Sequence, residues 1–366
     1  MPSVKPRFFT PGPLSMSDSV LAAMGRDWGS RDADFVDLTA ALLGGLKSLF
    51  GAGGDHALVP LQGSGTFAIE AMVGSIVPPG GKLLIFENGI YAARMANIAT
   101  ALGRSCRVVQ SSYLESLRPA AVAQILADDP AVTHVGIVHL ETGTGLLNPV
   151  QDIARAVQQA GRKLLVDAMA TVGAFDLGVT AVPCEAIAFS SNKCLQGPPG
   201  LGFVLARTKA LNEANSPSTV LDLYQQWQHL QRGGQWRFTP PTHVVAGTHA
   251  AMLELQVEGG AAARLARYAD NADALHAACT GQLGLEPVLA PQFRSPIIQA
   301  FTAPLHPAFC FDALYQFLKR RNLYIYPGTL TGSATFRIGC IGDIHRIDMT
   351  NLAAALGAYW DHAKLR

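Results

Sequence analysis

A lysine and an aspartate each follow a short apolar run in the middle of the chain. Asp167 ends the run Lys163–Val166, and Lys193 comes shortly after the run Ala186–Phe189. Such runs are typical of buried parallel strands, whose carboxyl ends meet in the crevice where open α/β sheets bind ligands. An amine and a carboxylate in that crevice suit pyridoxal phosphate. The amine would form a Schiff base, and the carboxylate would pair with the pyridinium nitrogen so that the ring accepts electrons.

Each of these two residues also has an ordinary interpretation, because most lysines are solvated and an aspartate after a strand commonly forms a turn or a helix cap. A third motif strengthens the cofactor hypothesis: Gly63-Ser64-Gly65-Thr66 leads into a helix expected to end near Val77. A loop of this kind offers free N–H groups, the positive end of the helix dipole and two hydroxyls to a phosphate. An ordinary helix start remains the alternative for the motif alone.

The same loop also fits a dinucleotide-binding protein. Residues 63–68 match the glycine fingerprint with alanine in the last place, and an expected strand over Lys82–Phe86 ends at Glu87, near where a ribose-binding acid belongs. However, Pro60 would lie in the central first strand, where a lost hydrogen-bond donor is poorly tolerated. This hypothesis also leaves the lysine and the aspartate unexplained. An NAD-dependent oxidoreductase is therefore a distant alternative.

Composition limits the class of protein and its partners. The chain has 366 residues, of which 49% are hydrophobic and 15% charged, and this predicts a large core and two domains. Its net charge of +1 gives no reason to expect nucleic acid as a partner. Six cysteines without CxxC spacing indicate reduced thiols and neither a disulfide framework nor a metal site. With no signal-peptide core and no bilayer-spanning apolar run, we expect a cytoplasmic protein without a membrane partner.

The order of expected elements predicts an α/β fold. Strand-like and helical segments alternate from Lys82 to Phe203, which is typical of a mostly parallel sheet covered by helices. We expect a proline-rich irregular arm at 1–15 and a large cofactor-binding domain at 16–259, with an early helix over residues 37–51. The helix and strand order changes after that, which predicts a smaller C-terminal α+β domain at 260–366.

Five further polar residues are candidates for the site. His139, Glu141 and Thr142 follow an apolar strand at the same expected sheet edge, where the histidine either packs in the core or contacts the cofactor ring. Arg31 stands in a polar, aromatic-bearing loop and is a candidate wall for an anionic substrate. Arg337 lies on a short apolar strand, where burial requires a partner. That partner is either an internal carboxylate or the carboxylate or phosphonate of a substrate, held by two parallel hydrogen bonds.

With all of these motifs, the chain resembles the class V aminotransferases of fold type I. Within that family it is most similar to the 2-aminoethylphosphonate–pyruvate transaminases and to their offshoot, the 1-hydroxy-2-aminoethylphosphonate ammonia-lyases. The resemblance covers nearly the whole chain, and several blocks in the right order make it specific. These blocks are TPGP at 10–13, LQGSGTF at 61–67, HLETGTGLLNP at 139–149, VDAM at 166–169, SSNKC at 190–194, QWRFTPPTH at 235–243, IYPG at 325–328 and FRIG at 336–339.

The resemblance implies a role for each matching residue. Lys193 is the expected Schiff-base lysine, Asp167 the pyridinium partner, and Ser64–Thr66 the phosphate cradle. Thr242 would complete the cradle of a neighbouring subunit, which implies a homodimer with shared active sites. Arg337 matches the family's anion-binding arginine. The cofactor is expected to be pyridoxal 5'-phosphate and the substrate a small aminophosphonate.

Departures from the transaminase pattern cluster where the substrate would lie. Arg31 replaces an aromatic residue, Leu140 and Gly143 replace small or hydroxylated residues, residues 170–172 replace a Ser-Ser-Phe run, and Thr329 replaces a lysine. This pattern favours an ammonia-lyase that acts on (R)-1-hydroxy-2-aminoethylphosphonate. The pyruvate-dependent transaminase of 2-aminoethylphosphonate is the alternative, and both reactions yield phosphonoacetaldehyde. A non-catalytic cofactor-binding module is a more distant alternative.

Overall fold

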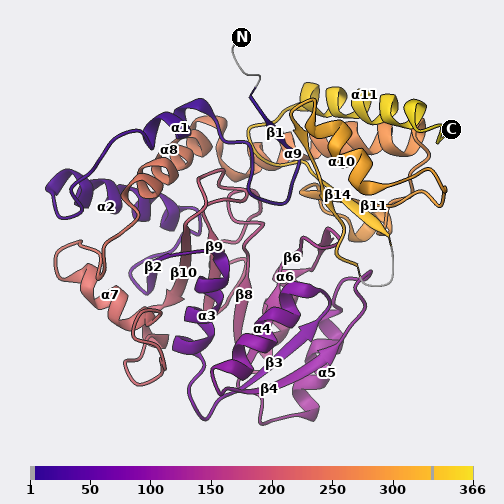
Figure 1. The fold of residues 1–366 in the computed structure, drawn as a ribbon. Coiled ribbons are helices and arrows are strands. Elements are labelled where there is room, and N and C mark those ends of the chain that lie inside the picture. The colour runs from indigo at the N-terminus through magenta and orange to yellow at the C-terminus, as the bar shows by residue number, and fades with distance from the viewer. Residues whose placement is uncertain (1–4, 331–333, 366) are drawn as a thin grey trace.

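A seven-stranded sheet forms the centre of the molecule (Figure 1). The structure, a computed structural model, describes residues 5–330 and 334–365. The strand order is β2-β10-β9-β8-β5-β3-β4, and β9, β8, β5, β3 and β4 run parallel to one another. The strands are β2 (His56–Gln62), β3 (Lys82–Glu87), β4 (Ser105–Gln110), β5 (His134–Val138), β8 (Lys163–Asp167), β9 (Ala186–Ser190) and β10 (Leu201–Arg207).

Two of the strands depart from the parallel arrangement. β10 runs antiparallel to both of its neighbours, β9 and β2. β2 stands at one end of the strand order and is therefore an edge strand. An edge strand tolerates Pro60 because one side of its backbone needs no ladder partner. The objection that Pro60 would disrupt a central strand thus does not apply to this sheet.

Helices cover both faces because neighbouring residues of the strands point to opposite sides and are apolar on each side. In β3, Leu84 and Phe86 join the core beneath α2, α5, α6 and α8, whereas Leu83 and Ile85 join the core beneath α3, α4 and α7. The helices of this part are α1 (Asp18–Ala23), α2 (Ala33–Ser48), α3 (Gly65–Ile76), α4 (Ile90–Ala101), α5 (Pro119–Asp128), α6 (Val150–Gln159), the short η1 (Thr208–Ala210), α7 (Leu223–Gln231) and α8 (Thr242–Glu258).

The helix expected over residues 37–51 begins earlier, at Ala33, and ends at Ser48. Its start is earlier because Phe35 is buried in the core and draws the first turn into the packed helix. Asp32 precedes it as the N-terminal cap residue. No helix in residues 5–330 or 334–365 is long and apolar enough to cross a bilayer.

The chain after Gly259 forms a second core of its own. A three-stranded antiparallel sheet in the order β11-β14-β13 packs with the helices α9, α10 and α11. The elements here are α9 (Gly260–Ala277), η2 (Ala278–Gln282), η3 (Pro291–Phe293), β11 (Ile298–Thr302), α10 (Phe311–Lys319), β12 (Leu323–Tyr324), β13 (Tyr326–Pro327), β14 (Thr335–Gly339) and α11 (Arg346–His362). Figure 1 shows this unit beside the carboxyl edge of the large sheet.

The sequence predicted an irregular N-terminal arm, but part of the arm forms a short strand. β1 (Arg7–Phe8) pairs in parallel with β12 of the C-terminal unit. The next residue, Phe9, is fully buried in the core of that unit. The sequence did not predict this strand because two residues are too few to show a periodic pattern. The burial of the Phe9 side chain holds the arm in place. The arm therefore packs with the end of the chain.

Candidate active site

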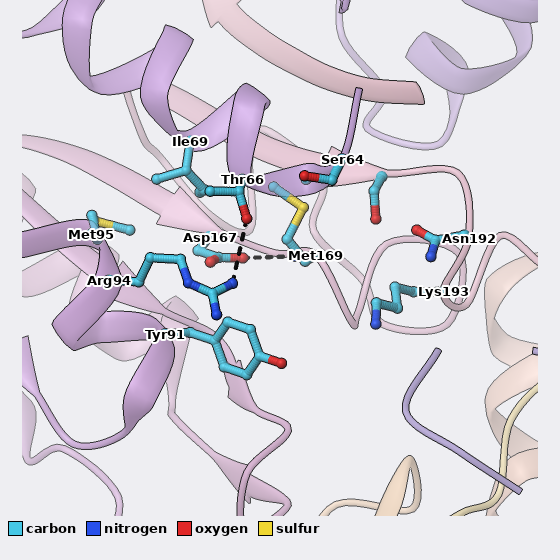
Figure 2. A pocket seen from close by; sticks show the side chains of 12 residues that line it. Ser64, Thr66, Ile69, Tyr91, Arg94, Met95, Asp167, Met169, Asn192 and Lys193 are labelled. Atoms are coloured by element: carbon cyan, nitrogen blue, oxygen red, sulfur yellow. Dashed lines mark hydrogen bonds between the residues drawn. The ribbon is translucent and has the colours of Figure 1, made fainter. Parts of the chain in front are cut away.

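Five of the predicted site residues line one cavity of about 190 Å³ at the carboxyl edge of the large sheet (Figure 2). They come from three different elements. Ser64, Gly65 and Thr66 lie at the start of α3, Asp167 ends β8, and Lys193 follows β9. The parallel neighbours β8 and β9 end at the same edge, which brings the carboxylate and the amine together.

Lys193 presents its amine to this cavity from the turn after β9. Nζ donates a hydrogen bond to the backbone oxygen of Pro11, 2.5 Å away. Burial, helped by the nearby charge of Arg337 and opposed by Cys194 and Asp167, lowers the pKa of the amine to about 8 from its ordinary 10.5. About a tenth of the amine is therefore neutral and nucleophilic at pH 7, far more than for a lysine of ordinary pKa.

Asp167 is buried at the end of β8, and its carboxylate accepts a hydrogen bond from the Met169 amide at 3.0 Å. Burial raises its pKa to about 6, while the Met169 amide and the positive charges of Arg94 and Lys193 favour the ionised form. A buried carboxylate has several lone pairs to satisfy. Since it lines the cavity, it has capacity for the protonated nitrogen of a pyridinium ring.

The start of α3 has the properties of an anion site. Ser64 is the N-terminal cap residue of α3, but its hydroxyl does not cap the helix and remains available. A Cβ on Gly65 would overlap the sulfur of Met169, so glycine leaves the space that this side chain occupies beside the start of α3. A helix N-terminus with spare hydroxyls can hold a phosphate group. The amine, the carboxylate and this anion site are the three features that pyridoxal phosphate requires, so the residues fit the cofactor.

The sequence did not single out Tyr91 and Arg94, which also line the cavity from α4. Arg94 donates from Nη1 to the hydroxyl oxygen of Thr66 at 3.4 Å, and in Figure 2 its guanidinium is drawn below Thr66 and Asp167. An arginine on a helix is usually solvated and gives no signal by itself. The available clue was position, since α4 begins directly after β3 at the same sheet edge as the other candidates.

Glu141 supports α4 and does not line the cavity. Its carboxylate accepts hydrogen bonds from the Tyr91 and Ala92 amides, at 3.3 and 3.0 Å, and so caps the start of that helix. Burial raises its pKa to about 7, and these two amides act in the opposite direction. Glu141 therefore holds the helix that brings Tyr91 and Arg94 to the site.

His139 is fully buried beside the cavity. Its Nδ1 lies 2.9 Å from the hydroxyl of Thr171, and its ring meets Phe175 edge-on at 5.4 Å between centroids. Burial lowers its pKa to about 3, so the ring is neutral. These contacts match the core interpretation of His139 and leave ring contact with the cofactor as a prediction.

Arg337 is 8% exposed on β14, and its guanidinium bridges two segments. Nη1 donates to the backbone oxygen of Thr142 at 2.8 Å, and Nε donates to that of Pro327 at 3.0 Å. Within residues 5–330 and 334–365, no carboxylate lies within salt-bridge distance of it. The Tyr91 hydroxyl is close enough to affect its pKa, which burial lowers. Arg337 thus carries a buried charge near the cavity and near Lys193.

The structure does not bring Arg31 or Thr242 to this cavity. Arg31 is exposed in the turn before α2. Thr242 is the half-buried first residue of α8. The expectation that Thr242 serves a neighbouring subunit stays a prediction.

Sheet order, helix coverage and the lysine–aspartate cavity together define a pyridoxal-phosphate enzyme of fold type I. The chain belongs to the family described as Aminotransferase class-V, whose model matches residues 18–332. This membership confirms the expected fold class and the expected cofactor, pyridoxal 5'-phosphate.

Several relatives with similar sequences are named 2-aminoethylphosphonate–pyruvate transaminase. The chain is 46% identical over 354 residues to 2-aminoethylphosphonate–pyruvate transaminase 1 of Paraburkholderia xenovorans, covering 96% of this chain and 91% of the relative. It is also 46% identical to the enzyme so named in Rhizobium meliloti, covering 96% and 92%. Among solved structures, pyridoxamine-pyruvate aminotransferase from Mesorhizobium loti matches with a TM-score of 0.89 and 25% identity, over 100% of this chain and 94% of the other.

Proposed function

We propose that this protein is a pyridoxal-phosphate-dependent transaminase that converts 2-aminoethylphosphonate and pyruvate into phosphonoacetaldehyde and alanine. The observation that carries the proposal is the cavity shared by Lys193 and Asp167, with the buried charge of Arg337 beside it. The names of relatives that are 43–46% identical favour this reaction over the ammonia-lyase reaction that the sequence ranked first.

Each residue has a distinct task in this proposal. Ser64, Gly65 and Thr66 bind the cofactor phosphate at the start of α3. Asp167 keeps the ring nitrogen protonated, and the cofactor then supplies the electron sink for the bond that breaks. The Lys193 amine, which faces the same cavity, would take the proton from the substrate carbon that bears nitrogen. Its lowered pKa of about 8 suits a general base near neutral pH.

Arg337 is the proposed binding group for the phosphonate. A phosphonate in a closed site needs fixed cationic donors, and a guanidinium can present two parallel hydrogen bonds. The carbonyl oxygens of Thr142 and Pro327 hold the side chain in place without neutralising its charge. The carboxylate of pyruvate can use the same cation in the second half of the reaction.

The ammonia-lyase is kept as a second candidate because two of the departures from the transaminase pattern meet in space. A Cβ on Gly143 would lie 2.7 Å from the hydroxyl oxygen of Thr329, so these two positions depend on each other. Gly143 also directly follows Thr142, whose carbonyl holds Arg337. A changed wall at this place supports a changed substrate. A lyase would expel the hydroxyl group of 1-hydroxy-2-aminoethylphosphonate and release ammonia without a keto acid.

Two assays on the purified enzyme test the choice. One contains 2-aminoethylphosphonate with pyruvate, and alanine is measured. The other contains 1-hydroxy-2-aminoethylphosphonate alone, and ammonia is measured. We expect alanine in the first assay and no ammonia in the second. Ammonia in the second assay with no alanine in the first would reject the transaminase and support the lyase.

A further inference from the structure

The arm residues that follow β1 lie between the C-terminal unit and the reactive lysine. Backbone hydrogen bonds fix Phe9 on both sides: its amide donates to the Tyr324 oxygen at 2.8 Å, and its oxygen accepts from the Gly339 amide at 2.9 Å. A Cβ on Gly339 would overlap the carbonyl of Thr10, so the arm packs directly on the end of β14. The backbone position of Pro11 and Gly12 is therefore set by the C-terminal unit.

Pro11 and Gly12 both contact the lysine that lines the cavity. The Pro11 oxygen accepts the hydrogen bond from Lys193 Nζ. A Cβ on Gly12 would overlap Nζ itself and would lie 3.1 Å from both Cδ and Cε. Gly12 has a φ of +130°, which side chains other than glycine rarely adopt. Two independent features, the backbone angle and the position of the amine, thus favour glycine at this position.

We infer that the Pro11–Gly12 peptide positions the reactive amine, and that Gly12 is a positioning residue for Lys193. When the amine is neutral, donation of one N–H to the Pro11 oxygen turns its lone pair away from the arm and toward the cavity. The absent side chain of Gly12 leaves the volume that Nζ occupies. The inference rests on the proposal that Lys193 is the lysine that holds the cofactor.

A methyl group at position 12 would move the amine more readily than it would unfold the protein. Nζ is the far end of a flexible side chain and can turn aside, so the overlap itself costs little stability. The amine would then lose both its hydrogen-bond partner and its direction. A misplacement of about 1 Å can lower a reaction rate roughly a hundredfold. Capture of the cofactor, not folding, is therefore the property that Gly12→Ala should damage.

The test compares Gly12→Ala with Gly233→Ala. Gly233 has a φ of +152° and, among the described residues, no atom within 4 Å of an added Cβ, so it shares the backbone cost without the lysine contact. Cofactor-free protein is mixed with pyridoxal phosphate, samples are reduced with borohydride at intervals, and mass spectrometry measures the cofactor fixed to Lys193. We expect capture to slow about a hundredfold in Gly12→Ala and to stay within about twofold of wild type in Gly233→Ala. Equal rates in Gly12→Ala and wild type would overturn the inference.

Two further measurements distinguish a failure of this inference from a failure of the proposal that Lys193 holds the cofactor. Wild-type protein labelled at another lysine, or at none, would reject Lys193 as the cofactor lysine. If Gly12→Ala does not fold, it is repeated in the Lys193→Ala background, where the overlap is gone. A double variant that folds would support the contact. A double variant that also fails to fold would show that Gly12 is needed only for its backbone angle, and would overturn the inference.

Discussion

Arg337 is a buried cation. Two backbone carbonyl oxygens hold its guanidinium, and none of the carboxylates among the described residues forms an ion pair with it. Retaining such a charge is costly unless a ligand anion shares the site. We expect Arg337→Lys to lower kcat/KM for the aminophosphonate about a hundredfold, because an ammonium lacks the forked donors that grip a phosphonate. The visible absorbance of the bound cofactor should not change.

Steady-state kinetics with the purified variant measure this effect. Arg320→Lys, at an exposed position after α10, is the control and should behave as wild type. Catalysis near the wild-type level in Arg337→Lys would make Arg337 a structural residue.

The lowered pKa of Lys193 predicts a pH dependence of cofactor capture. The neutral amine is the reactive form, and its population rises as pH rises through about 8. Capture by the cofactor-free protein should therefore accelerate about tenfold between pH 7 and 9 and then level off. Stopped-flow absorbance measures the rate. A rate that keeps rising toward pH 10.5 would mean that Lys193 has the ordinary pKa of a solvated lysine.

At the scale of elements, α4 depends on a side chain from another strand. Glu141, in the short β6 (Leu140–Glu141) that pairs with β7 (Leu146–Leu147), caps α4 from outside the helix. Glu141→Ala removes that cap and should lower the free energy of unfolding by about 1–2 kcal/mol. It should also weaken cofactor binding, because Tyr91 and Arg94 lose their support. Thermal unfolding and cofactor titration measure the two effects.

The matched control for that variant is Glu286→Ala, since Glu286 is exposed on the C-terminal unit. It should change neither property. If Glu141→Ala retains wild-type stability and affinity, the cap has no role in shaping the site.

The sequence predicted the strand that ends at Asp167 and the strand that precedes Lys193, because their apolar runs end abruptly at polar residues. It predicted the start of α3 from a loop whose composition favours turns. It did not reveal Arg94, since nothing in an isolated helix distinguishes an arginine in a cavity from a solvated one. Nor did it reveal that β10 is antiparallel, because a buried strand has the same apolar pattern in either direction.

At the scale of the whole molecule, a second cavity beside the Gly63–Thr66 loop has exposed apolar side chains. Phe67, Val220 and Phe238 line it and are 49%, 56% and 40% exposed. Exposed apolar groups in one place commonly mark a protein interface. From this surface, and from the resemblance that places Thr242 in a neighbour's site, we expect a homodimer whose contact includes the loop Gly63–Thr66.

We expect Phe67→Asp to shift the protein toward monomers, because a charge would replace apolar surface in the contact, and to lower cofactor retention with it. Sedimentation velocity at assay concentration measures the first effect, and absorbance after gel filtration measures the second. Leu305→Asp is the control, since Leu305 is fully exposed on the C-terminal unit. Wild-type protein that sediments as a fully active monomer would remove Thr242 from the active site.

The pairing of β2 with β10 has a consequence for synthesis on the ribosome. β2 is made early, yet its ladder partner is residues 201–207, so the loop that follows β2 stays unsupported until much of the sheet has emerged. The strand that anchors the arm, β12, comes still later. A nascent chain that lacks β12 contains Lys193, but its Pro11–Gly12 peptide is not yet fixed against the Lys193 amine. The cofactor should therefore be acquired only after β12 has been made and has paired with β1.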